Sequence, residues 1–240
     1  METANQAVQE SYNKITKKIY VFLGSYCILL LAFLFSEFIF HHIGYTITAD
    51  ESPINWFTAV GLVLASFAAV MVFSELSSCF PNRGKYNFLW ILIASGLLWA
   101  AFDEQFELHE KVGSIIDSWV SGSSFELFFY RIFDEGEKLI IMLYAAGGIM
   151  MTFVFLFRMV SSRKAAKCFI TAIVFQVLAM LCDRFNVVFD IFGIYSKNPN
   201  YTGYIEEISE FLSSSLFFGT MLLEYFWLRV LSKNKISIIQ

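Results

Sequence analysis

The residue types best suited to chemistry are concentrated in the segment 103–110, whose sequence is DEQFELHE. Four of these eight residues are carboxylic acids, and one is a histidine. Residues three or four apart share one face of a helix, so Asp103, Glu107 and Glu110 continue a stripe that passes through Gly96. Small and polar residues mark the face that a membrane helix turns toward its neighbours. The stripe therefore predicts carboxylates that point into a helix bundle.

Other apolar segments carry acids at comparable positions near one end. Asp183 shares a face with small and polar residues in one later segment, and Glu210 shares a face with Glu206 in another. Glu37 and His41 are four residues apart near the end of the first apolar segment, so they also share a face. Ionisable groups at membrane depth are costly and usually face a cavity or a partner. These acids are therefore expected to meet in one layer.

Carboxylate oxygens suit Mg²⁺, Ca²⁺ or Mn²⁺, and an added imidazole favours iron or zinc. A bound metal would lower the pKa of a water molecule or polarise a substrate oxygen. A carboxylate outside the ligand set, Glu104 or Glu110, is the candidate general base. The pattern predicts a site for a divalent metal ion with these candidate ligands: Asp103, Glu107, His109, Asp183, Glu210, Glu37 and His41.

Structural interpretations of the same residues remain open. The chain has no HExxH, and Phe106 stands three residues before His109, where a ferritin-like site would carry Glu. Glu206 begins a predicted helix, where a carboxylate favours the positive end of the helix dipole. Asp183 precedes Arg184 and can form an ion pair. Solvated or capping acids are thus the alternative to metal ligands.

One acid, Glu224, stands apart from the rest near the other end of the last apolar segment. The sequence predicts a structural pair between Glu224 and a neighbouring basic helix end. The alternative is a proton path along Ser213 and Thr220, which follow the same helix.

The composition predicts the elements that must position these residues. The 240 residues are 57% hydrophobic and only 16% charged, against about 25% charged in soluble domains. A core of this size cannot hide so many apolar residues, so much of the surface must face lipid. Spanning a membrane takes about 20 apolar residues as helix. The prediction is a single all-α domain over 1–240, a polytopic membrane helix bundle with six transmembrane helices at about 20–40, 55–74, 87–108, 139–157, 168–189 and 206–230.

The distribution of charge predicts the orientation. With the N-terminus inside, 12 of the 17 Lys and Arg residues fall on the cytoplasmic side, as the positive-inside rule requires. On that assignment 17 of the 21 acids and all three histidines lie at the outer side. We expect both termini in the cytoplasm and the bundle in the plasma (inner) membrane. The stretch 110–138 contains Trp119 and several Phe residues beside charges, which predicts an interfacial helix or hairpin between the third and fourth spans.

Small residues predict where helices pack closely in lipid. Gly61, Ala65 and Ala69 recur at steps of four in the second span, and 145–148 form a small-residue patch in the fourth. Both are expected at helix–helix contacts.

Three functions fit these patterns. The first is a metal-dependent membrane enzyme that opens to the outer leaflet and acts on a lipid or other amphipathic substrate. The second is a cation or proton transporter or channel with the acidic layer as its outer vestibule. The third is a non-catalytic membrane subunit or sensor. The expected partner is the lipid bilayer, and the basic residues form no stripe of the kind that binds nucleic acid.

Overall fold

The computed structural model is all-helical and describes residues 2–39, 53–79, 84–133, 135–184 and 200–234. Long helices account for most of these residues, and each of them overlaps one of the predicted apolar segments. They are α1 (Glu2–Ile39), α2 (Pro53–Cys79), α3 (Gly84–Phe106), α6 (Gly136–Val154), α7 (Arg163–Arg184) and α9 (Asn200–Lys233). Two shorter helices, α4 (Leu108–Val120) and α5 (Glu126–Phe133), lie between α3 and α6, and a π-helical turn, η3 (Phe155–Met159), extends α6.

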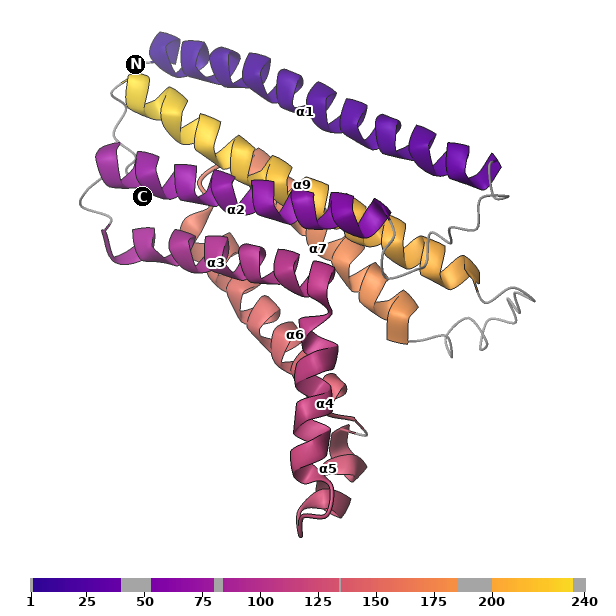
Figure 1. The fold of residues 1–240 in the computed structure, drawn as a ribbon. Helices are drawn as coiled ribbons and strands as arrows, with labels where there is room; N and C mark the ends of the chain where they lie inside the picture. The colour runs from indigo at the N-terminus through magenta and orange to yellow at the C-terminus, as the bar shows by residue number, and fades with distance from the viewer. Residues whose placement is uncertain (1, 40–52, 80–83, 134, 185–199, 235–240) are drawn as a thin grey trace.

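The last helix, α9, is the centre of the bundle (Figure 1). It packs against α7, α2 and α1, and α2 packs in turn against α3. The start of α1 and the end of α9 lie at the same end of the bundle (Figure 1), where Val8, Val230 and Leu231 form a buried cluster.

The predicted small-residue stripe of α2 is confirmed as a packing face. Ala65 and Ala69 are both fully buried. At Gly61 an added Cβ atom would stand 2.7 Å from the Ser214 hydroxyl oxygen of α9, so the glycine permits the close approach of these two helices. The main apolar core continues from this stripe toward Trp90, Phe155 and the C-terminal half of α9.

The corresponding prediction for the fourth span is wrong. Gly147 and Gly148 have open space where a Cβ atom would stand, and Gly148 is exposed. The helix α6 diverges from the bundle, and only 6% of its most apolar window is buried, against 50% in α2. Its main partner is α4, so its small residues face away from the other long helices.

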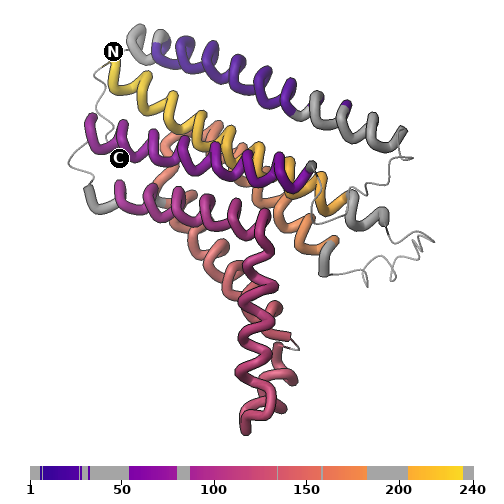
Figure 2. The backbone as a smooth tube through the Cα atoms, in the orientation of Figure 1, coloured from indigo at the N-terminus to yellow at the C-terminus, as the bar shows by residue number. Residues whose placement is uncertain are grey.

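A helical hairpin made by α4 and α5 projects from the bundle near the end of α3 (Figure 2). Its apolar side chains are unusually open: Trp119 is 78% exposed and Leu127 is 87% exposed. The backbone N–H of Gly122, which has a positive φ of 74°, donates to Glu126 Oε2 at 2.8 Å and closes the turn between the two helices. A hairpin between the third and fourth spans is thus present, as the aromatic stretch predicted.

Candidate functional site

The segment that carries most of the predicted site is bent at Glu107. This residue has φ 49° and ψ 46°, the left-handed conformation that non-glycine residues rarely adopt. The helix α3 ends one residue earlier, and α4 begins one residue later. The prediction of one unbroken helix through residue 108 is therefore wrong at this point. The face shared by Asp103, Glu107 and Glu110 does not continue, because the backbone changes direction between them.

The bend brings Asp103 against His109. One carboxylate oxygen, Oδ1, accepts the backbone N–H of His109 at 2.7 Å, and Oδ2 lies 3.1 Å from Nδ1 of its ring. Both side chains are largely buried, with 13% of Asp103 and 26% of His109 exposed. The first bond caps the new helix α4, and the second fixes the orientation of the imidazole. The hydrogen bond from Asp103 raises the pKa of His109 above its ordinary value, although partial burial acts in the opposite direction.

The bend is further stabilised by Lys111. Its ammonium donates to the backbone carbonyl of Phe106 at 2.6 Å, an acceptor that the end of α3 leaves without a helical partner. The backbone N–H of Lys111 donates to the carbonyl of Glu107 at 3.1 Å. The left-handed residue is thus held from both sides by hydrogen bonds.

Close packing of α4 against α6 positions a third element at the site. A Cβ atom on Gly113 would stand 2.5 Å from the backbone nitrogen of Glu137, so this crossing requires glycine. Asp117 Oδ1 accepts the backbone N–H of Gly136 at 2.9 Å and caps the start of α6. Glu137 and Glu110 consequently lie within electrostatic range of His109, and both favour its charged form.

A fourth element contributes carboxylates from α9. Glu104 interacts electrostatically with Glu207, with its neighbour Asp103 and with Glu206. Acids of α3 and α9 thus lie within electrostatic range of one another, but Glu206 and Glu207 are not among the predicted ligands. Beside them, the side-chain oxygen of Gln105 is buried without a hydrogen-bond partner among the described residues. The end of α3 and the start of α9 therefore place acids within electrostatic range of one another.

The remaining predicted ligands are only partly described. Glu210 is half-buried in α9. Glu37 and Asp183 lie in the last turns of α1 and α7, but their side chains fall outside the described residues, as does His41 altogether. Within the described part of the chain, no three His, Cys, Asp or Glu side chains are arranged to hold a metal ion.

A second polar site, at the other end of the bundle, surrounds Glu224. This side chain is fully buried, and its two oxygens accept the backbone N–H groups of Ser161 at 2.8 Å and Ser162 at 3.0 Å. The hydroxyl of Tyr12, from α1, lies 2.5 Å from Ser162 Oγ and donates to the Leu223 carbonyl at 3.2 Å. Burial raises the pKa of Tyr12 above its ordinary value, so the hydroxyl keeps its proton at neutral pH.

For Glu224 the sequence predicted a structural pair with a basic helix end, and the structure adds two backbone N–H partners at the start of α7. The Ser161-Ser162 pair before Arg163 is a helix-start signal that could have indicated an anion-binding end. Along the alternative proton path, Ser213 donates to the Ala172 carbonyl at 3.0 Å and Thr220 donates to the Leu216 carbonyl at 2.8 Å. Both hydroxyls thus bond to helix backbone.

The fold and composition define the class of protein. Five described helices are long and apolar enough to cross a membrane: α2, α3, α6 with η3, α7 and α9. The chain thus has the architecture of a multi-pass helical membrane protein. The sixth predicted span lies in α1, where many side chains of the outer half are outside the described residues.

Comparison with known families gives one result. Residues 43–224 match the family described as a domain of unknown function, DUF8692. The match covers about three quarters of the chain, so the protein belongs to this family. The matched region includes the Asp103–His109 pair, the α4–α5 hairpin and Glu224. No curated protein and no solved structure matches the chain.

Proposed function

We propose that the protein is a membrane-embedded enzyme that binds a divalent cation beside the Asp103–His109 pair and acts on a lipid or other amphipathic substrate. The observation that carries this proposal is the contact between one carboxylate and one imidazole at a point where acids of α6 and α9 also converge. Like charges brought together in a poorly solvated place repel one another. A bound cation relieves that repulsion.

The Asp103–His109 pair suits either metal binding or proton transfer. An ionised Asp103 accepts a hydrogen bond from Nδ1–H, so the lone pair of the neutral imidazole lies on Nε2. A carboxylate that orients a histidine in this way is common behind metal ligands and behind general bases. On this view His109 touches the metal or the substrate, and Asp103 orients it. Glu104 and Glu110 remain the candidate general bases, and the other predicted ligands complete the coordination shell.

The surroundings of the pair favour a substrate from the lipid phase. One turn before Asp103, the Trp99 ring nitrogen donates to the Tyr144 hydroxyl of α6 at 2.8 Å. Both aromatic residues are well exposed, and Tyr144 is within electrostatic range of Asp103. Trp and Tyr with polar tips are typical of the membrane–water boundary. A substrate with an apolar tail and a polar head fits this position.

We also propose six membrane spans with both termini in the cytoplasm, and an α4–α5 hairpin that lies in the outer interface of the plasma membrane. The positive-inside distribution supports the orientation, and the exposed Trp119 and Leu127 support the interfacial position. Single cysteines at residues 5 and 123, in a cysteine-free background, test both points in intact cells. A membrane-impermeant thiol reagent should label only the cysteine at 123. Labelling of residue 5 would reverse the orientation.

The metal content of the purified protein tests the site itself. The comparison is between wild type, Asp103→Asn and His109→Gln, each incubated with Zn²⁺ or Mn²⁺, desalted and measured by elemental analysis. Glu10→Gln is the matched control, because Glu10 is an exposed acid whose oxygen lies 3.0 Å from Lys14 Nζ near the opposite end of the bundle. We expect near-stoichiometric metal in wild type and control, and its loss in His109→Gln. Equal metal content in all four folded proteins would contradict the proposal.

A further inference from the structure

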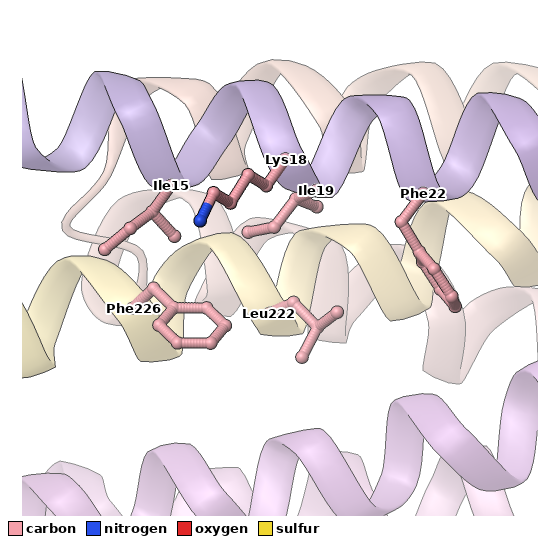
Figure 3. Close-up of a pocket in the computed structure, with 6 residues that line it drawn as sticks. All are labelled: Ile15, Lys18, Ile19, Phe22, Leu222 and Phe226. Atoms are coloured by element: carbon pink, nitrogen blue, oxygen red, sulfur yellow. The ribbon is translucent and has the colours of Figure 1, made fainter.

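A groove between α1 and α9 has no part in the site described above. Its volume is about 360 Å³. Figure 3 shows its walls, with the ammonium of Lys18 extending along the gap between the two helices. Five of the six lining side chains are apolar, and the sixth is a lysine: Ile15, Ile19, Phe22, Leu222, Phe226 and Lys18.

Contacts on both sides of the groove hold its walls in place. Toward the start of α1, the rings of Tyr12 and Trp227 lie 4.8 Å apart. Toward the other end, an added Cβ atom on Gly219 would stand 2.5 Å from Leu23 Cδ1, which shows that the helices are in close contact there. The groove is the interval between these two contacts, and it belongs to the packing of α1 on α9.

The positive charge of Lys18 favours a negatively charged ligand in the groove. The Lys18 ammonium makes no hydrogen bond and no ion pair with any described residue, whereas Lys14 pairs with Glu10 and Lys164 donates to Asn13 at 2.7 Å. The acid closest in sequence to the groove on α9, Glu224, directs its oxygens to the backbone of Ser161 and Ser162 instead. The groove therefore presents one uncompensated positive charge beside an apolar wall.

The position of the groove along α1 indicates that this ligand comes from the membrane. Lys18 lies two residues before the apolar run that starts at Tyr20. With the N-terminus inside, which is the orientation proposed above, this is the depth of the inner-leaflet headgroups. Basic pockets between helices on this side of a membrane bind anionic lipid headgroups. We propose that the groove binds an anionic phospholipid of the inner leaflet, with its phosphate on Lys18 and an acyl chain along Ile19 and Leu222.

Such a lipid would bridge α1 and α9 and stabilise the folded state by an amount that grows with the logarithm of the lipid concentration relative to its Kd. This inference rests on the proposed orientation but not on the metal site. A loss of metal binding in His109→Gln would not bear on the lipid site. A failure to find lipid binding would likewise not bear on the metal site.

The experiment measures the thermal stability of the full chain in a neutral detergent during titration with phosphatidylglycerol or phosphatidylcholine. The variant is Lys18→Gln. The matched control is Lys17→Gln, which removes the same charge from an exposed neighbouring position outside the groove. We expect phosphatidylglycerol to raise the unfolding temperature of wild type and Lys17→Gln more than phosphatidylcholine does. Lys18→Gln should bind phosphatidylglycerol about fivefold more weakly, as expected for one basic residue near the headgroup.

Three results would overturn the inference. Equal stabilisation by the two lipids would show that the groove does not select charge. Equal losses in Lys17→Gln and Lys18→Gln would show a diffuse surface effect instead of a site. The same stabilisation by inorganic phosphate alone would show that the acyl chain is not bound. Native mass spectrometry should in addition find one retained phosphatidylglycerol per chain in wild type, and a dimer in its place would identify a second copy of the chain as the occupant.

Discussion

The two ends of the bundle use buried carboxylates in opposite ways. At one end Glu224 is fully buried, and each of its oxygens accepts a backbone N–H group at the start of α7. At the other end Asp103 bonds to His109, while the adjacent Glu104 faces the charges of Glu206 and Glu207. The first carboxylate accepts preorganised backbone donors, whereas the carboxylates of the second group lie within electrostatic range of one another.

This difference separates a structural site from the site that we propose to be functional. Hydrogen bonds from a helix N-terminus stabilise an anion without further partners, so Glu224 joins α9 to α7 and, through Ser162 and Tyr12, to α1. Acids that repel one another stay close together only when the surrounding fold holds them there. Such groups are frequent at functional sites. The left-handed backbone at Glu107 supports the same view, because strained residues also concentrate there.

The largest expected effect is at the compensated end. Glu224→Ala removes the acceptor of two backbone N–H groups, and each orphaned group costs about 1–3 kcal/mol. The free energy of unfolding should fall by about 2–6 kcal/mol, measured by thermal and chemical unfolding in detergent. Glu224→Gln retains one acceptor oxygen and should lose clearly less. An alanine variant as stable as wild type would show that the carboxylate does not hold these helices together.

A smaller effect is expected from Tyr12→Phe, which removes one hydroxyl from the same end. The ring contact with Trp227 remains, but the bonds to Ser162 Oγ and to the Leu223 carbonyl are lost. The expected loss of stability is about 1 kcal/mol. In a double-mutant cycle with Glu224→Gln, the two losses should not add, because both act through Ser162. If the two losses in the free energy of unfolding add strictly, the Tyr12 and Glu224 contacts are independent of each other.

The smallest effect on stability, and the most specific, is expected from Asp103→Asn at the end of the bundle that carries His109. Because the hydrogen bond from Asp103 raises the pKa of His109 in the folded state, this pair contributes stability fully below pH 6.5, the ordinary histidine value. The contribution disappears as the pH rises through the folded-state pKa. Wild type should therefore lose this contribution as the pH rises from 6.5 through the raised pKa of His109, and Asp103→Asn should show a flatter profile.

Histidine nuclear magnetic resonance gives the direct measurement. The resonance assigned to His109, by its absence in His109→Gln, should titrate above the ordinary value in wild type and move down in Asp103→Asn. Asp117→Asn is the control, since it changes a carboxylate that caps α6 and has no direct bond to His109. An unchanged His109 pKa in Asp103→Asn would show that Asp103 does not favour the charged imidazole, and the two ends of the bundle would then no longer differ in this respect.

Particular residues show how far the sequence could predict the site. Asp103, Glu104 and His109 were identified because acids and imidazoles inside or beside apolar helices are rare and costly. The bond between Asp103 and His109 was not predicted, since helical periodicity places them on different faces of an unbroken helix. Only the left-handed conformation of Glu107 brings them together, and a glutamate gives no signal of that conformation.

The sequence by itself determined that this chain forms long apolar helices, because a backbone in lipid must satisfy its own hydrogen bonds. It also determined the small-residue face of α2, where close packing needs Gly61, Ala65 and Ala69. Only the tertiary structure decided which of the two small-residue patches packs against another long helix. Residues 145–148 have the same character as the α2 patch, yet α6 turns away from the bundle with α4. It also decided the partner of Glu224, because a backbone N–H group is present at every residue except proline, and only the fold determines which ones are left free to bind a carboxylate.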